Sequence, residues 1–241
     1  GRSTLCRDSW SGCTSYRGSS HERTFILMEK TALKICGIRS LEEIQDLKDL
    51  PIDYFGCIFA PRSPRYVSVA LVKEITEIAH SEGKQTVGVF VNAPLEQIAD
   101  IVNLTGIDVV QLHGEESPDI CKMLTTKGIT VWKAFSIKDK LLPMEDYLPY
   151  MDLPLLDTKG VAEGGNGLVF NWQLLERLTP YSFILAGGIS VENVQKALSY
   201  QPAIIDVNSK VEQDNRKSRQ LIEKLIKEME KYRSGIQKYN K

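Results

Sequence analysis

The sequence predicts a single α/β domain, a (β/α)8 or TIM barrel, preceded by a tail outside the barrel. Short β-branched apolar runs alternate with amphipathic stretches eight times over about 200 residues, which suits such a barrel. The apolar runs are almost unbroken, as expected of parallel strands buried on both faces. The glycine-rich turns come late in the chain, whereas a doubly wound open sheet, the competing fold, would carry its glycine-rich turn early.

Residues 1–27 differ from the rest of the chain, and we expect a disordered or non-native N-terminal extension there. They are rich in serine and arginine, contain no lysine and show no periodic apolar pattern. They lack the continuous apolar run of a secretory signal peptide, and their composition only weakly resembles an organellar transit peptide. Met28 stands directly before a regular strand pattern. We therefore place the barrel at residues 28–235 and a C-terminal tail at residues 236–241.

Composition and charge argue against several kinds of partner. The 241 residues include 30 Lys and Arg against 31 Asp and Glu, a balance that gives no basis for binding nucleic acid or an anionic membrane. No apolar run approaches the roughly 20 residues that cross a bilayer. The five cysteines lack a paired spacing, which is typical of reduced thiols in a cytoplasmic protein. No metal, Walker or dinucleotide motif is present, so we expect no metal and no cofactor.

The predicted strands are short and are separated by helical patterns with start signals. The strands are expected at Leu33–Gly37, Asp53–Ala60, Gln85–Val91, Asp108–Gly114, Thr130–Phe135, Leu153–Thr158, Ser182–Gly188 and Ala203–Ser209. Ser40, Ser68 and Ser190 each precede an amphipathic run and are predicted N-caps, because a serine side chain accepts hydrogen bonds from the first helical turn. The last helix is expected from Lys217 to about Tyr232, with its apolar residues on one face.

Barrels of this kind carry their chemistry on the loops after the C-terminal strand ends. Cys36 and Asp157 end the first and sixth strands and should face the same mouth. A thiol can act as a base, and a shielded carboxyl can stay protonated and act as an acid. The alternatives, a buried apolar cysteine and a carboxylate that caps a loop, remain open from position alone. Arg65, after the second strand, is either a bidentate carboxylate ligand or a solvated loop arginine.

Glycines and small polar residues gather in the loops after the last three predicted strands. They are Gly165 within Glu163–Gly167, Gly187 and Gly188 after the seventh strand, and Asn208 and Ser209 after the eighth. Glycine lets the backbone approach a ligand closely, and the loops after strands seven and eight commonly bind phosphate. We therefore expect a phosphate site rather than tight turns alone. Asp206 lies beside it, whereas His113 is expected only to hold loops by hydrogen bonding.

Eight motifs extend over Leu33–Lys227 in the order and spacing of one family. They read KICGI, GCIFAPRSPRYVS, VGVFVN, VVQLHGEE, LLDT, GGNGLVFNW, LAGGISVENV and DVNSKVE. In these motifs the chain resembles the phosphoribosylanthranilate isomerases of tryptophan biosynthesis. The resemblance implies an intramolecular Amadori isomerase that binds phosphoribosylanthranilate, needs no cofactor and acts as a monomer or homodimer.

The resemblance also implies roles for residues already singled out. Cys36, the cysteine of KICG, would be the general base, and Asp157 of LLDT the general acid. Arg65 would bind the anthranilate carboxylate, and Asp206 would orient substrate hydroxyls. The other expected substrate contacts are Gly165, Gly187, Gly188, Asn208 and Ser209. A sibling barrel isomerase of histidine biosynthesis has a carboxylate where this chain has Cys36, which favours the tryptophan-pathway substrate.

The chain departs from the family pattern after the eighth strand. The family reads SSGVE where residues 208–212 read NSKVE, and Lys210 lacks the freedom of glycine to adopt positive φ. Further on, Asn215 and Ser218 replace a glycine and an aspartate, but asparagine tolerates a left-handed turn and serine can cap a helix. The altered loop raises a second hypothesis, a barrel that binds a phosphate ligand and converts it weakly. The retained acid, base and arginine argue against it.

Overall fold

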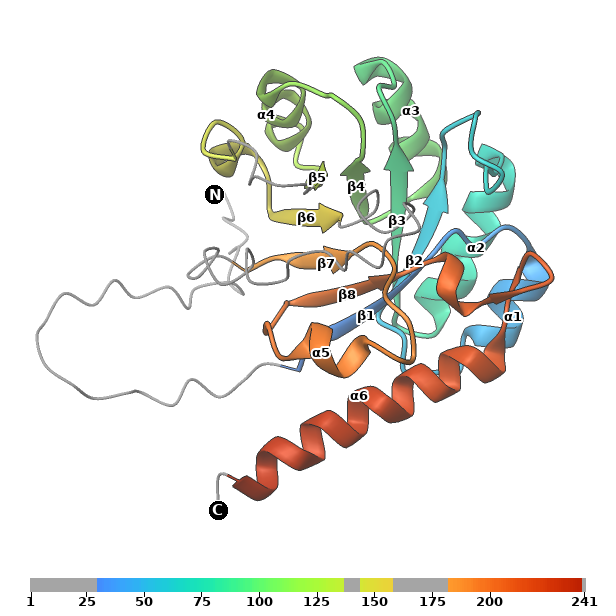
Figure 1. Cartoon of the computed structure of the whole chain (residues 1–241). Coiled ribbons are helices and arrows are strands. Elements are labelled where there is room, and N and C mark those ends of the chain that lie inside the picture. Colours follow the sequence, from blue (N-terminus) through green and yellow to red (C-terminus); the bar gives the residue numbers. More distant parts are fainter. Residues whose placement is uncertain (1–29, 137–143, 158–181, 240–241) are drawn as a thin grey trace, which may run out of the picture.

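The computed structural model describes residues 30–136, 144–157 and 182–239. Within them, parallel strands close into a barrel in sequence order, and β1 pairs with both β2 and β8 (Figure 1). The strands are β1 (Ala32–Cys36), β2 (Tyr54–Ile58), β3 (Gln85–Phe90), β4 (Val109–Leu112), β5 (Thr130–Ser136), β6 (Leu153–Asp157), β7 (Ile184–Ala186) and β8 (Ile204–Val207). All eight predicted strands are confirmed, and barrel closure excludes the open doubly wound sheet.

Helices lie on the outside of the barrel (Figure 1). They are α1 (Leu41–Leu47), α2 (Val69–Ser81), α3 (Leu95–Thr105), α4 (Pro118–Thr126), α5 (Val194–Leu198) and α6 (Arg219–Tyr239). The connections after β5 and β6 include residues outside the described ranges, and the described part of the first contains a 3-10 helix, η1 (Leu148–Tyr150). No helix within the described ranges is long and apolar enough to span a membrane.

Two predicted N-caps are confirmed. Ser40 Oγ accepts a hydrogen bond from Glu43 N at 3.2 Å, and Ser68 Oγ accepts one from Leu71 N at 3.3 Å. These bonds satisfy N–H groups that have no partner within the helix. Both helices therefore begin where the sequence predicts.

The third predicted N-cap, Ser190, does not start its helix. α5 begins only at Val194, and Asn193 occupies the capping position. The Asn193 side chain instead braces the preceding turn, because its Oδ1 accepts from Ser190 N and its Nδ2 donates to Gly188 O, both at 2.9 Å. This side-chain bracing delays the helix, so the expectation for Ser190 was wrong.

A two-stranded hairpin that the sequence did not predict precedes the last helix. β9 (Glu212–Gln213) and β10 (Arg216–Lys217) pair in antiparallel fashion. Asp214 and Asn215, between them, have φ of 51° and 59°, and two-residue hairpin loops favour positive φ at these positions. The expectation that Asn215 tolerates a left-handed turn is confirmed. Lys217 lies in a strand, so the last helix starts later than predicted.

α6 (Arg219–Tyr239) also extends beyond its predicted end and includes residues 236–239, which the sequence placed in a tail. Ser218 Oγ lies 3.5 Å from Leu221 N at the start of this helix, as expected of a capping serine. Its apolar face is buried at Ile222, Leu225, Ile226 and Met229. No proline interrupts the pattern, and the single Gly235 costs a helix only about 1 kcal/mol.

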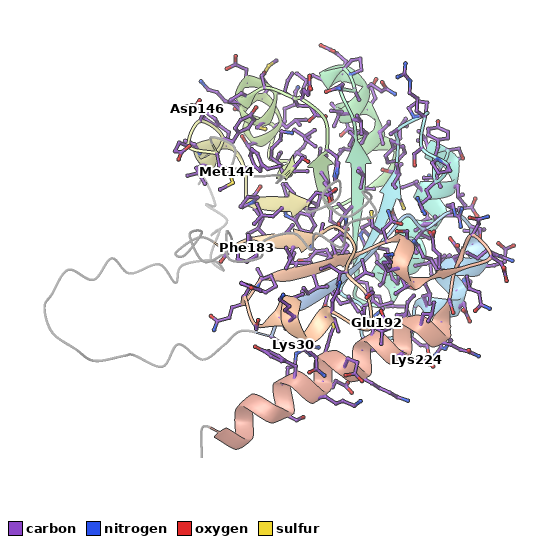
Figure 2. The ribbon with its side chains drawn as sticks, in the orientation of Figure 1. Lys30, Met144, Asp146, Phe183, Glu192 and Lys224 are labelled. Atoms are coloured by element: carbon purple, nitrogen blue, oxygen red, sulfur yellow. The ribbon has the colours of Figure 1, made fainter. Side chains whose placement is uncertain are left out.

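Buried apolar side chains form two main cores, one between the sheet and the helices and one inside the barrel. Figure 2 draws the described side chains on the ribbon of Figure 1. The inner core is apolar toward the N-terminal ends of the strands, and Trp132 lies there. Closer to the C-terminal ends, several of the inward positions two residues further on are polar. Lys34, Gln111 and Asp206 occupy them and are 0%, 1% and 8% exposed. The barrel thus contains a buried polar layer just below its mouth.

Three aspartates connect neighbouring strands at the opposite end of the barrel. Each stands directly before an even-numbered strand and accepts a backbone N–H from the odd-numbered strand before it. The pairs are Asp53 Oδ2 with Leu33 N at 2.8 Å, Asp108 Oδ2 with Thr86 N at 2.7 Å, and Asp152 Oδ2 with Val131 N at 2.7 Å. These bonds lie away from the functional face of such barrels and serve stability.

Replacing Asp152 by alanine should lower the free energy of unfolding by about 1–3 kcal/mol, because Val131 N would lose its acceptor inside a buried strand. Urea unfolding at neutral pH measures this loss. Asp100→Ala, which removes an exposed carboxylate from α3, is the matched control and should change stability by less than about 0.5 kcal/mol. Equal losses in the two variants would contradict a stabilising role for this bond.

Candidate active site

Cys36 is the last residue of β1 and lies inside the mouth of the barrel, packed with Ile58 and Val89. Only 5% of it is exposed. Burial raises the pKa of the Cys36 thiol, and the neighbouring ammonium of Lys34 opposes that rise. Gly56 on β2 provides the space, since a Cβ there would lie 2.8 Å from Cys36 Sγ. The cysteine is therefore a shielded thiol with a cation beside it.

Cys57 and Cys121 are buried in the outer core between the strands and the helices. Burial raises the pKa of the Cys121 thiol to about 11 and raises that of Cys57 still further. Neither residue belongs to the small cluster around Cys36 at the mouth. These two thiols therefore do not reach the rim.

Asp157 ends β6 at the same mouth, and a histidine contacts it. His113 Nε2 lies 3.1 Å from Asp157 Oδ2, and His113 Nδ1 lies 2.9 Å from Gln111 Nε2. His113 follows Gln111 by two residues, so both side chains point toward the barrel interior. The structure therefore connects His113 to the candidate acid, where the sequence led us to expect only contacts that hold loops together.

Lys34 is a site residue that the sequence analysis missed. Its Nζ donates to Gln111 Oε1 and to Asp206 Oδ2, each at 2.8 Å, and the residue is completely buried. Burial by itself lowers the pKa of Lys34, but the Asp206 carboxylate and the Cys36 sulfur raise it above its ordinary value. The ammonium therefore stays charged. The sequence did contain a signal for this residue. Lys34 stands two positions before Cys36, so both side chains lie on one face of the strand.

Asp206 lies on β8 and has one carboxylate oxygen that a ligand could use. Oδ2 accepts the hydrogen bond from Lys34, whereas the buried Oδ1 has no hydrogen-bond partner among the described residues. A buried carboxylate oxygen without a donor costs free energy. This oxygen is suited to a ligand hydroxyl or N–H at the mouth.

Arg65 belongs to an ion cluster that connects the loops after β2 and β8. Its Nε and Nη2 donate to Glu212 Oε1 and Oε2 at 2.8 and 2.6 Å. Lys217 Nζ donates to Glu212 Oε1 at 2.7 Å and to Asn208 Oδ1 at 2.9 Å. Burial would raise the pKa of Glu212, but the hydrogen bonds and charges of Arg65 and Lys217 lower it to about 2. The Glu212 carboxylate thus binds both Arg65 and Lys217. The two guanidinium N–H groups of Arg65 that were predicted to bind a ligand carboxylate already bind Glu212.

Gly37 allows these loops to approach the end of β1. It has a φ of 82°, a conformation that favours glycine. A Cβ at this position would lie 2.7 Å from Arg65 Cδ and 3.0 Å from Asn208 Oδ1. Directly after Cys36, the chain therefore requires a residue without a side chain.

The residues predicted to bind phosphate lie after β7 and β8, and the structure describes most of them. Gly187 and Gly188 have φ of 89° and 69°, and a Cβ on Gly188 would meet no atom within 4 Å. Asn208 follows β8, and Ser209, which is exposed, begins the 3-10 helix η3 (Ser209–Val211). Gly165 lies outside the described residues.

Lys210 fits the loop after β8 without strain. It lies within η3 and is not among the residues with positive φ. Its side chain is exposed, and its charge lowers the pKa of the Glu192 carboxyl together with the Ser190 hydrogen bond, which is the larger cause. The change from glycine therefore gives no backbone reason to regard the site as weakened.

The closed parallel barrel and the thiol, carboxyl and cationic side chains around its C-terminal mouth define an enzyme of the (β/α)8 class. A family model described as N-(5'phosphoribosyl)anthranilate (PRA) isomerase matches residues 33–228. The chain therefore belongs to the PRA isomerase family. It is an intramolecular isomerase of tryptophan biosynthesis.

Relatives and solved structures agree with this assignment. The N-(5'-phosphoribosyl)anthranilate isomerase of Campylobacter jejuni is 38% identical over 200 residues, covering 83% of this chain and 98% of the relative. The enzyme of Brevibacillus brevis is 33% identical over 219 residues, covering 87% and 98%. The PRA isomerase structure from Thermotoga maritima has a TM-score of 0.74 and 34% identity over 83% of this chain and 98% of that chain.

The ion cluster around Glu212 predicts a specific loss of stability in acid. The pKa of Glu212 is lower in the folded protein than in the unfolded chain, so its stabilising contribution is present above about pH 4.5. That contribution disappears as the pH falls from there toward the folded value of about 2. Urea unfolding between pH 7 and pH 2 should therefore show a steeper decline for the parent than for Glu212→Gln.

The same variant should be less stable than the parent at neutral pH, because it leaves the buried Lys217 without its carboxylate. Glu230→Gln, which neutralises an exposed residue of α6, is the control and should follow the parent at every pH. Parallel curves for the parent and Glu212→Gln would show that the cluster does not stabilise the fold.

Proposed function

We propose that this chain converts phosphoribosylanthranilate into 1-(2-carboxyphenylamino)-1-deoxyribulose 5-phosphate, with Asp157 as general acid and Cys36 as general base. The observation that carries the proposal is the placement of the two groups. They end β6 and β1 and face one barrel mouth, and hydrogen bonds run from Lys34, which stands two residues before Cys36, through Gln111 and His113 to Asp157.

In the first step, Asp157 donates a proton to the furanose ring oxygen. The bond between that oxygen and C1′ breaks, and the lone pair of the anthranilate nitrogen forms the iminium. The orientation of His113 supports this role. Lysine donates only, so the Gln111 carboxamide must turn its oxygen to Lys34 and its NH2 to His113 Nδ1. The neutral imidazole then carries its proton on Nε2 and donates to Asp157 Oδ2, which positions the carboxyl.

In the second step, the Cys36 thiolate removes the proton from C2′. The electrons of that C–H bond form the C1′=C2′ double bond of an enolamine, and the iminium nitrogen regains its lone pair. The enol then loses its hydroxyl proton, and C1′ gains a proton, giving the ketone. Each protein group handles one proton, which suits general acid–base catalysis.

The two anionic ends of the substrate would be held on opposite sides of this chemistry. Arg65, oriented by Glu212, would bind the anthranilate carboxylate, and Asp206 Oδ1 would accept a hydrogen bond from the substrate. The phosphate would bind at Gly165, Gly187, Gly188, Asn208 and Ser209. A solved PRA isomerase in complex with reduced 1-(o-carboxyphenylamino)-1-deoxyribulose 5-phosphate, 31% identical with a TM-score of 0.71, supports a substrate of this size and charge. Its alignment covers 83% of this chain and 98% of that chain.

We further propose a cytoplasmic enzyme that is a monomer or a homodimer. The three described cysteines are free, as expected in a reducing compartment. A Thermotoga maritima relative, 33% identical, is described as a dimeric enzyme. Residues 1–27 lie outside the described part of the chain, so their proposed nature as a disordered or non-native extension rests on their composition.

Cys36→Ser and Asp157→Asn should each lower kcat by about 10²–10⁴-fold, because each removes one proton-transfer group. The measurement is the loss of fluorescence after adding freshly generated phosphoribosylanthranilate. Cys121→Ala, which changes a thiol in the outer core, should retain parental turnover per folded molecule. Parental turnover by Asp157→Asn would exclude Asp157 as the acid. Binding without turnover by the parent would instead support the weakly converting barrel.

Arg65→Lys should raise KM about 10- to 100-fold, because a charged hydrogen bond contributes about 1.5–3 kcal/mol and an ammonium cannot pair with Glu212 as the guanidinium does and also present a fixed N–H to the substrate carboxylate. Steady-state kinetics separate this effect from any change in kcat. Arg62→Lys, a charge-conserving change at an exposed arginine of the same loop, is the control and should leave KM within about twofold. An unchanged KM in Arg65→Lys would exclude the carboxylate contact.

A further inference from the structure

We propose that Lys34 is a positioning residue whose buried ammonium favours ionisation of the Cys36 sulfur, and that Asp206 moderates this effect by sharing the ammonium. The inference rests on the proposed role of Cys36 as the base. It concerns a buried charge that the two proton-transfer steps do not themselves use.

The hydrogen-bonding capacity of Lys34 supports this role. An ammonium has three N–H donors and no acceptor. Two donors bind Gln111 Oε1 and Asp206 Oδ2 at 2.8 Å, which leaves a third N–H for the neighbouring sulfur of Cys36. A thiolate accepts such a bond better than a thiol, so the arrangement favours the ionised sulfur.

The packing around Gly56 keeps the ammonium and the sulfur together. A Cβ on Gly56 would lie 2.8 Å from Cys36 Sγ and 3.2 Å from Lys34 Cε. Both side chains therefore border the one inward position on β2 that carries no side chain. Lys34 has no route to solvent, because none of its surface is exposed.

Several charged or titratable groups act on Cys36. They are Lys34 on its own strand, Asp206 on β8, Lys217 on β10, Arg65 in the loop after β2, and Cys57 on β2. After burial, which raises the pKa of Cys36, Lys34 has the largest effect and lowers it. Asp206 raises it, and Lys217 lowers it to a smaller extent. Lys34 and Asp206 therefore oppose each other at the sulfur.

Two variants that differ only at Lys34 provide the test. Asp206→Asn keeps the ammonium and removes the anion that shares it, whereas Lys34→Met/Asp206→Asn removes both charges and leaves neither unpaired. The readout is the rate at which iodoacetamide alkylates Cys36 in the folded protein at pH 6–10, followed on the peptide that contains Cys36. Because the thiolate reacts, the midpoint of this profile reports ionisation of the sulfur.

We expect the midpoint to fall below the parental value in Asp206→Asn. In the double variant it should lie about one pH unit or more above that of Asp206→Asn, which makes alkylation about tenfold slower near neutral pH. Equal midpoints in the two variants would overturn the proposal. If the double variant does not fold, Lys34→Gln/Asp206→Asn makes the same comparison with an uncharged amide in place of the apolar side chain.

The pH dependence of kcat/KM separates this inference from the proposed function. If Cys36 is the base, the ascending limb should shift in the same direction as the alkylation midpoint. A shifted alkylation midpoint together with an unshifted ascending limb of kcat/KM would uphold the effect of Lys34 on the sulfur. The same result would contradict Cys36 as the base. Equal midpoints together with an inactive Cys36→Ser would overturn the role of Lys34 and leave the base assignment intact.

Discussion

The buried ammonium of Lys34 is the constraint on which the arrangement of the mouth depends. A charge enclosed in a barrel is costly unless other groups pair with it and satisfy its hydrogen bonds. Asp206 supplies the opposite charge from β8, and Gln111 supplies a neutral acceptor from β4. The lack of a side chain at Gly56 on β2 leaves space for Lys34 and Cys36. The buried cation on β1 therefore constrains which side chains β2, β4 and β8 can place beside it.

A second ionic arrangement organises the loops above this layer. Glu212 accepts hydrogen bonds from both Arg65 and Lys217, and Lys217 also contacts Asn208. The loop expected to bind a carboxylate is thereby connected to the loop expected to bind phosphate. Because these cations are already held in place, little free energy is spent on reorganising them when an anionic substrate binds. The same contacts therefore support the folded loops and prepare them for a ligand with two anionic ends.

Sequence reasoning predicted the strands well because a buried parallel strand has an apolar signature of its own. Cys36 and Asp157 could be placed at one mouth because each ends such a strand. The hydrogen bonds of Lys34 and His113 could not be predicted from the sequence, because they join different strands and depend on the register of those strands. The hairpin β9–β10 is too short to show periodicity. The Arg65–Glu212 pair could not be predicted, because both residues also suit exposed loops.

The three aspartate bonds and the Lys34–Asp206 pair differ in how far apart their partners lie in the chain. Each aspartate bond joins residues about 20 positions apart, so it can form while the chain is still assembling locally. Lys34 and Asp206 are 172 positions apart and meet only where β1 pairs with β8. The environment of Cys36 therefore comes into existence with the closing of the barrel. If Cys36 is the base, we expect the return of isomerase activity during refolding to mark closure of the sheet rather than formation of its strands.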